Sequence, residues 1–200
     1  MRKEERKLQS MTNIFKSLFK KKEYFYYPAV PPEIDLRLRL PKENRSQMRV
    51  LNVGVGSGKS GLACQLPFLI FKRLDHVEIH KPYIDEAMKI EWDSFEVNFI
   101  HEDIRNIDYW PYDIVLMFDI LEHLPKEDSL KLMDKIKCKQ VIFIPLEKEF
   151  RKNIYGAESQ DHLSLWTEDD FKNRGYQTEV LKDFHHEDNK VFDALWAIKN

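Results

Sequence analysis

The chain has 200 residues, of which 42% are hydrophobic and 33% are charged, and its formal net charge is −2. This length suits one domain with a sizeable core, and the composition excludes an intrinsically disordered chain. The two cysteines, Cys64 and Cys138, are too few for a disulfide framework and form no metal-binding CxxC pair. No apolar run approaches the roughly 20 residues that cross a bilayer, and residues 1–7 lack the apolar core of a secretory signal. We therefore expect a cytoplasmic protein.

Charge is unevenly distributed along the chain. Residues 1–50 hold 13 Lys and Arg against 6 Asp and Glu, a balance of +7, whereas the rest hold 19 against 28, a balance of −9. Hydrophobic spacing within residues 1–20 predicts an amphipathic helix, and the proline-rich residues 24–32 predict an extended connector. We therefore assign residues 1–45 to a basic arm and connector and residues 46–200 to a domain. We favour a solvated terminus for the arm; steering of an anionic partner is the alternative.

Strand and helix patterns alternate from residue 48 onward. Strands are predicted at residues 49–53, 76–79, 95–100, 113–118 and 140–144, and helices at 59–73 (kinked by Pro67), 84–92 and 126–137. After a short helix capped by Thr167, two β-rich runs predict an antiparallel hairpin with His185 and His186 in its solvated turn. This order predicts an α/β fold, a Rossmann-like doubly wound sheet that is mostly parallel.

A glycine-rich turn follows the first predicted strand. Gly54, Gly56, Gly58 and Gly61 fall within eight residues, where glycine permits positive φ and lets the backbone approach a ligand closely. A phosphate-binding P-loop requires glycine where this chain has Val53, so the Gly-Lys-Ser at residues 58–60 only mimics that motif. An aspartate after the fourth strand keeps a P-loop-like ATP-binding protein open as an alternative.

Acidic residues at three strand ends narrow the choice among the nucleotide-binding proteins that carry such a glycine turn. Glu78 lies 20 residues after Gly58, at the end of the second strand, where an acid can accept from both ribose hydroxyls. Asp103 follows the third strand, and residues 119–125 (Asp-Ile-Leu-Glu-His-Leu-Pro) follow the fourth. In this order and spacing, residues 48–198 resemble the class I S-adenosylmethionine-dependent methyltransferases, notably small members with an Asp-x-Leu-Glu-His segment after strand four.

The resemblance implies seven strands in the order 3-2-1-4-5-7-6, with an antiparallel C-terminal hairpin, and S-adenosylmethionine as the cofactor, converted to S-adenosylhomocysteine. It implies three sets of cofactor contacts: Gly54, Gly56, Gly58, Phe118 and Asp119 at the methionine and ribose, Glu78 at the ribose hydroxyls, and Ile79, Asp103 and Ile104 at adenine. Asn52 stands where the family has an acid that contacts the cofactor ammonium. The amide keeps an acceptor but loses the charge.

The acceptor is only partly constrained. A proton-removing group is needed if the acceptor is a hydroxyl or a protonated amine, and the resemblance places the candidates His162 and His123 near the carboxyl ends of strands. We predict no metal site. The chain lacks the Asn/Asp-Pro-Pro-Tyr segment of enzymes that methylate nucleobase amines or glutamine amides, which argues against that group and leaves oxygen, carbon and other nitrogen acceptors open. We favour a small-molecule acceptor. An anionic or macromolecular substrate bound through the basic arm is the alternative. A non-catalytic S-adenosylmethionine-binding module, which Asn52 favours, is a second hypothesis for function.

Overall fold

The computed structural model describes residues 32–59, 61–150, 160–187 and 190–200. From residue 33 onward they belong to one compact unit, Glu33–Asn200. The predicted amphipathic helix and most of the connector lie outside the described residues. Residues 33–45, assigned above to the connector, belong to the compact unit, and Leu36 and Leu40 are buried in its core. In the described part of the chain, no helix is long and apolar enough to cross a membrane.

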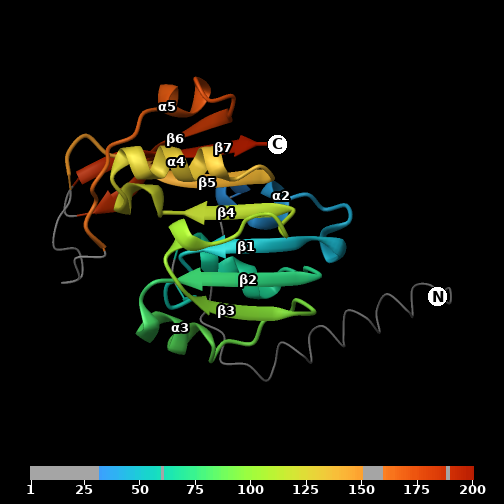
Figure 1. Ribbon diagram of the computed structural model, residues 1–200. Coiled ribbons are helices and arrows are strands. Elements are labelled where there is room, and N and C mark those ends of the chain that lie inside the picture. Colours follow the sequence, from blue (N-terminus) through green and yellow to red (C-terminus); the bar gives the residue numbers. More distant parts are fainter. Residues whose placement is uncertain (1–31, 60, 151–159, 188–189) are drawn as a thin grey trace, which may run out of the picture. The chain divides into compact units, whose positions relative to one another are not determined.

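A seven-stranded sheet forms the centre of this unit, in the order β3-β2-β1-β4-β5-β7-β6 (Figure 1). The first five strands are parallel, and β7 pairs antiparallel with both β5 and β6. The predicted strand order and C-terminal hairpin are therefore confirmed. The strands are β1 (Arg49–Val53), β2 (Arg73–Glu78), β3 (Val97–His101), β4 (Ile114–Phe118), β5 (Lys139–Leu146), β6 (Gln177–Glu187) and β7 (Lys190–Lys199).

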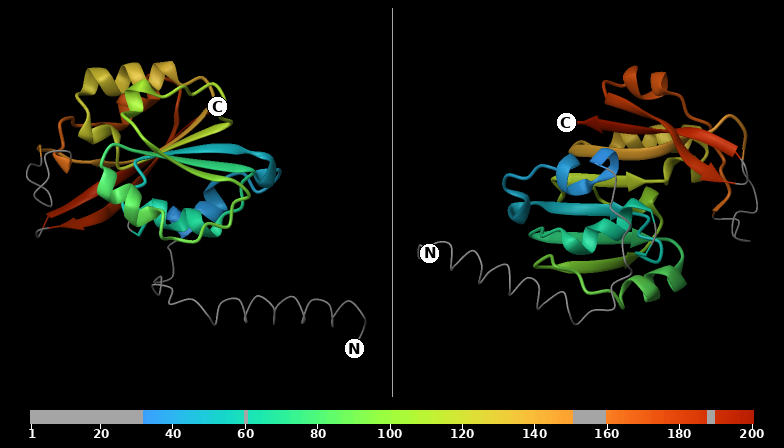
Figure 2. Two further views of the ribbon diagram at one scale, coloured as in Figure 1. Left: turned by 60° about the horizontal axis from the view of Figure 1, so that its bottom comes forward. Right: turned by 180° about the vertical axis from the view of Figure 1, so that it is seen from behind.

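Helices cover both faces of the sheet. The α-helices are α2 (Leu36–Arg39), α3 (Lys81–Ala87), α4 (Lys126–Lys135) and α5 (Glu168–Lys172), and the 3-10 helices are η1 (Pro32–Ile34), η2 (Arg45–Gln47), η3 (Leu62–Phe68), η4 (Ile104–Asn106) and η5 (Leu121–His123). Figure 2 shows α4 on one face and α2 with η3 on the other. The core is divided accordingly: Leu51 of β1 packs in the cluster that contains α4, and Val50 packs in the cluster that contains α2 and η3. This division follows from the alternation of side chains along a strand.

The segment after the glycine turn differs from its prediction. Instead of a kinked helix over residues 59–73, the chain forms only η3 and then enters β2 at Arg73. Pro67 lies inside η3, where it has no backbone N–H to donate and its ring obstructs a longer α-helix. The Gln65 side chain holds η3 to the start of the unit, because its amide donates to the Ile34 carbonyl (2.9 Å) and its oxygen accepts from the Leu36 amide (2.9 Å).

The C-terminal hairpin also differs in one respect. The predicted turn contained His185 and His186, but β6 continues to Glu187, so both histidines lie within a strand. His185 pairs in register with Phe192 of β7. The longer strands carry this end of the hairpin to the carboxyl-terminal edge of the parallel strands, where the cavity described below lies.

Candidate functional site

A cavity of about 960 Å³ opens at the carboxyl ends of the parallel strands. Ligands bind at this edge of open α/β sheets, where neighbouring strands send their connections to opposite faces, and the volume suits a small organic ligand. The structure brings most of the predicted site residues together here. Those that line the cavity are Gly54, Gly56, Glu78, Ile79, Asp103, Ile104, Phe118, Asp119, His123 and His162.

The glycine turn forms one wall of the cavity. Gly54 has φ +70°, a backbone conformation that strains any other residue, and a Cβ added to it would displace the end of the Ile120 side chain. Gly56 has φ +54°, and its N–H donates to the Glu78 Oε2 (3.0 Å). The turn after β1 is therefore fixed against the carboxylate at the end of β2.

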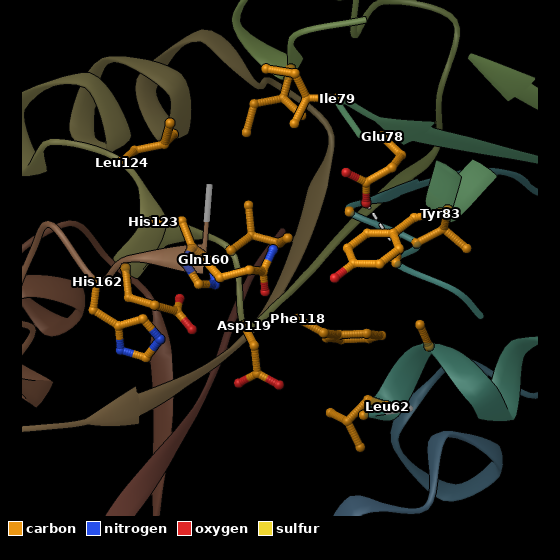
Figure 3. A pocket seen from close by; sticks show the side chains of 18 of the residues that line it. Leu62, Glu78, Ile79, Tyr83, Phe118, Asp119, His123, Leu124, Gln160 and His162 are labelled. Atoms are coloured by element: carbon orange, nitrogen blue, oxygen red, sulfur yellow. Dashed lines mark hydrogen bonds between the residues drawn. The ribbon is translucent and has the colours of Figure 1, made fainter. Parts of the chain in front are cut away.

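Glu78 is held in place by two backbone amides. Its side chain accepts from the Gly56 N–H (3.0 Å) and from the His80 N–H (2.9 Å), and the residue is buried. A carboxylate offers about four acceptor positions, so these two bonds leave acceptor capacity for a ligand. Figure 3 shows the ring of Tyr83, from α3, beside Glu78, with its hydroxyl toward the middle of the cavity. Sequence reasoning missed Tyr83, because a helix residue of this kind belongs to no motif.

Asp103 and Arg105 form an ion pair on the same side of the cavity. The Asp103 carboxylate accepts from the Arg105 backbone N–H (2.9 Å), which caps η4, and from its guanidinium Nε (3.0 Å). This guanidinium holds the pKa of Asp103 below its usual value. Both side chains line the cavity, as do Ile79 and Ile104. This region therefore combines apolar surface with an acceptor that Arg105 already engages.

Phe118 and Asp119 lie at the end of β4. Phe118 is buried against Trp196, with ring centroids 6.0 Å apart. Asp119 has φ +53°, a left-handed conformation that residues other than glycine rarely adopt, and its N–H donates to the Phe143 carbonyl (2.9 Å). Backbone conformations of this kind are concentrated at functional sites. The carboxylate at this strand end is thus held by an unusual turn.

Two predicted cofactor residues do not line the cavity. Asn52 is fully buried, and its amide nitrogen lies 3.2 Å from the Nδ1 of His76, its neighbour in β2. Burial lowers the pKa of His76 to about 3, so its imidazole is neutral. Gly58 is buried too, and a Cβ there would lie 2.7 Å from the Ile90 Cδ1. Both positions serve the packing beneath the turn.

His123 and His162 lie together on the wall opposite Glu78 (Figure 3), with ring centroids 4.8 Å apart. The Nδ1 of His123 lies 3.2 Å from the Asp161 carbonyl, and the Nδ1 of His162 pairs with the Glu147 carboxylate. Burial, together with the neighbouring His162, lowers the pKa of His123. The two predicted proton-removing candidates therefore occupy one site.

Glu122 lies beside these histidines and was not among the predicted site residues. It lines the cavity and is only 1% exposed. Burial and the nearby Asp119 carboxylate raise the pKa of Glu122 well above its usual value. Its place in the Asp-x-Leu-Glu-His segment was the available signal. The resemblance assigned it no role, however, and nothing local in the sequence indicates its burial.

The hairpin supplies a further part of the wall. His185 and Phe192 line the cavity, and their rings stack with centroids 5.0 Å apart and planes inclined by 20°. The prediction that His185 lies in a solvated turn is therefore wrong, because β6 extends past it. Gln160 and Leu163, which precede α5, complete this side.

Comparisons with known proteins bear on the fold. No protein-family model matches the sequence, and a search of curated proteins finds no match. Among solved structures, the magnesium protoporphyrin IX methyltransferase ChlM of Synechocystis PCC 6803, with bound S-adenosylmethionine, is similar over 78% of this chain and 72% of its own, with 15% identity and a TM-score of 0.51.

Two further structures are similar over more of this chain. An S-adenosylmethionine-dependent methyltransferase of Leishmania major covers 84% of it and 70% of its own length, with 14% identity and a TM-score of 0.59. DhpI, in a complex named with SAM and HEP, covers 86% and 89%, with 15% identity and a TM-score of 0.58. The chain therefore has the fold that these methyltransferases share.

Proposed function

We propose that this chain is an S-adenosylmethionine-dependent methyltransferase that binds its cofactor in the cavity between the ends of β1, β2 and β4. The carrying observation is the Glu78 carboxylate, which the amides of Gly56 and His80 hold at the cavity wall with acceptor capacity left. The fold supports this proposal, since structural neighbours carry S-adenosylmethionine or S-adenosylhomocysteine.

We assign one part of the cavity to the cofactor and the other part to the methyl acceptor. We assign Glu78 to the ribose hydroxyls, with Ile79 and Asp103 at adenine and Asp119 at the methionyl end. S-adenosylmethionine would supply the methyl group from its sulfonium centre. The protein's own task is to hold donor and acceptor aligned, and positioning alone can supply effective molarities of about 10⁵ M or more.

The other part of the cavity is where we propose that the acceptor binds. Its wall combines His123 and His162 with His185, Phe192 and Gln160, and so offers both polar and aromatic contacts. A cavity of about 960 Å³ that is shared with a nucleoside cofactor leaves room for a small molecule. We therefore favour a small-molecule acceptor and assign His162 or His123 to removal of its proton when it carries a hydroxyl or a protonated amine.

The ATP-binding alternative loses support from the position of Lys59. A P-loop lysine reaches the phosphates of its ligand, but Lys59 is exposed, does not line the cavity and pairs with Glu86 (3.0 Å). The glycine turn leads into a 3-10 helix that begins only at Leu62. Calorimetry with S-adenosylmethionine, S-adenosylhomocysteine and ATP separates the hypotheses. Binding of ATP alone would refute our proposal, and binding of both sulfur nucleotides without turnover on a broad acceptor panel would favour a non-catalytic module.

Replacement of Glu78 gives the sharpest test of the site. We expect Glu78→Ala to weaken S-adenosylmethionine binding at least about tenfold, because two ribose hydroxyls lose a charged acceptor. Calorimetry measures the dissociation constant, and circular dichroism verifies the fold. Glu96→Ala is the matched control, since Glu96 is exposed and does not line the cavity. An unchanged dissociation constant for Glu78→Ala would show that the ribose does not bind there.

A further inference from the structure

The Glu122 carboxylate is buried without any visible compensation. Among the residues that the structure describes, neither of its side-chain oxygens has a hydrogen-bond partner, although the residue is only 1% exposed. A carboxylate in such surroundings is stable only if it is protonated or if a cation neutralises it. The side chain faces the cavity beside the two histidines, so a ligand that enters the cavity can supply the missing partner.

The two imidazoles are oriented as metal ligands usually are. A carbonyl oxygen can only accept, so the contact with Asp161 places the proton of His123 on Nδ1 and leaves the Nε2 lone pair available. The contact between the Nδ1 of His162 and the Glu147 carboxylate does the same for His162. Metal-binding histidines typically donate their second ring nitrogen to a carbonyl or carboxylate in this way, which fixes the tautomer and the ring.

We propose that Glu122, His123 and His162 bind one divalent transition-metal ion of the Zn²⁺ or Fe²⁺ type. Each residue offers one ligand atom, and these atoms all lie within 4.8 Å of one another. Bonds of roughly 2.0–2.2 Å to a tetrahedral ion would bring such atoms to about 3.4 Å, so the three side chains must close by small rotations. Two imidazoles and one carboxylate suit these ions and leave a coordination position open for water or a substrate atom. This proposal replaces the sequence-based expectation that the chain has no metal site.

The backbone around the three residues is fixed in advance. The Glu122 carbonyl accepts from the amides of Leu163 (2.6 Å) and Ser164 (3.1 Å), which join η5 to the segment that carries His162. The hydroxyls of Ser129 (2.9 Å) and Ser164 (3.0 Å) both donate to the Leu121 carbonyl. Segments about 40 residues apart in sequence are thus tied together at the point where their side chains converge.

The position of this cluster points to a class of acceptor. All three residues line the cavity, and so does Asp119 at the end of β4. On the proposed methyltransferase function, on which this step rests, a bound ion would coordinate an oxygen of the acceptor and favour its deprotonated form. The inferred acceptor therefore carries a hydroxyl or carboxylate oxygen.

Metal binding can be measured without cofactor or acceptor. The full chain is freed of metal with a chelator, dialysed, and titrated with Zn²⁺ by calorimetry, and bound metal is then quantified by mass spectrometry. Co²⁺ is used as a second probe, because its visible absorption reports nitrogen ligation and coordination number. We expect one ion per chain and a spectrum of low coordination number. If titration of the chain gives no more Zn²⁺ binding than titration of the dialysis buffer alone, the proposal is overturned. Glu122 is then a protonated, neutral side chain.

Variants test which side chains hold the ion. Glu122→Gln and His162→Gln are each expected to weaken Zn²⁺ binding roughly hundredfold or more, and Glu147→Gln about 10- to 100-fold through the orientation of His162. His101→Gln is the matched control, since His101 is exposed and does not line the cavity. Thermal melts identify any variant that does not fold, and the Co²⁺ spectrum of the parent chain tests the ligand set without any variant. Equal affinities in all four variants would also overturn the proposal.

Failure of this proposal is separable from failure of the proposed function. Zn²⁺ binding without binding of either sulfur nucleotide would support the metal site and refute the methyltransferase. Binding of the sulfur nucleotides by a metal-free chain that takes up no Zn²⁺ would support the methyltransferase and refute the metal site.

Discussion

Asn52 and His76 occupy neighbouring positions of β1 and β2 and form a buried polar pair. The Asn52 amide nitrogen lies 3.2 Å from the Nδ1 of His76, whose ring also stacks on Phe99 at a centroid distance of 5.1 Å. An amide can donate to a neutral imidazole, whereas a carboxylate at position 52 would be buried as a charge unless His76 took up a proton. An asparagine at position 52 therefore matches its neighbour in the core.

His76 makes the stability of the fold depend on pH. Burial lowers the pKa of His76 to about 3 in the folded state, against about 6.5 in an unfolded chain. Between these values the unfolded state binds one more proton than the folded state. The contribution of His76 to the free energy of unfolding is therefore complete above about pH 6.5. It is lost as the pH falls below that value, by about 1.4 kcal/mol per pH unit.

The test compares two chains, so that other titrating groups cancel. The free energy of unfolding is measured with urea at about pH 7.5 and about pH 5 for the parent chain and for His76→Phe, whose ring can still pack on Trp92 and Phe99. We expect the parent to lose roughly 2 kcal/mol more than the variant between these pH values. An equal loss in both chains would mean that His76 is accessible to protons in the folded state.

Some site residues could be predicted from the sequence and others could not. Glu78 could be predicted because it ends a strand at a fixed distance after the glycine turn. The backbone carbonyl of Glu122 accepts from the amides of Leu163 and Ser164, about 40 residues further on, and the local sequence pattern cannot reveal such contacts. The ion pair between the Arg105 guanidinium and the Asp103 carboxylate is likewise a contact between particular side chains that the sequence pattern does not reveal.

The same limit applies to whole elements. The apolar run of β4 and the two runs of the hairpin were predictable, because burial on both faces and alternation are properties of the segment itself. The segment that forms η3 was predicted to be part of a longer helix over residues 59–73, because the spacing of its apolar residues is helical. Pro67 and the contacts of Gln65 with residues 34 and 36 determine its actual form, and the latter are tertiary.

Helix α5 gives a test at this scale. Its first turn carries a capping box, in which Thr167 and Asp170 each accept from the backbone N–H of the other. Phe171 in this helix is fully buried, so the helix must form for the core to close. We expect Thr167→Ala to lower the free energy of unfolding by about 1 kcal/mol, and Thr167→Ser to preserve it. Urea unfolding measures both, and equal stability of the two variants would show that the cap contributes nothing.

At the scale of the whole molecule, strand order assembles the site from distant parts of the sequence. The central pair of β1 and β4 brings the glycine turn next to Asp119, and the hairpin of β6 and β7 adds His185 from near the end of the chain. The sequence predicted this order through its resemblance to a family. It did not predict the reach of the hairpin, because strand length beyond Phe184 depends on pairing between the two strands.

Charge distribution supports the last prediction. Residues 1–22 hold eight Lys and Arg and two Glu, a balance of +6, and they precede the residues that the structure describes. Opposite charges attract over a range that salt shortens to about 10 Å at 0.1 M.

If the predicted arm steers the protein to an anionic partner, its deletion should abolish salt-sensitive binding to phosphatidylserine vesicles without changing the melting temperature. Vesicle sedimentation at several salt concentrations measures this, with neutral phosphatidylcholine vesicles as the control. Replacement of Lys16, Lys20, Lys21 and Lys22 by Gln keeps the apolar face and should have the same effect. If the parent chain binds neither kind of vesicle, or if the deleted chain binds as the parent does, the arm has no such role.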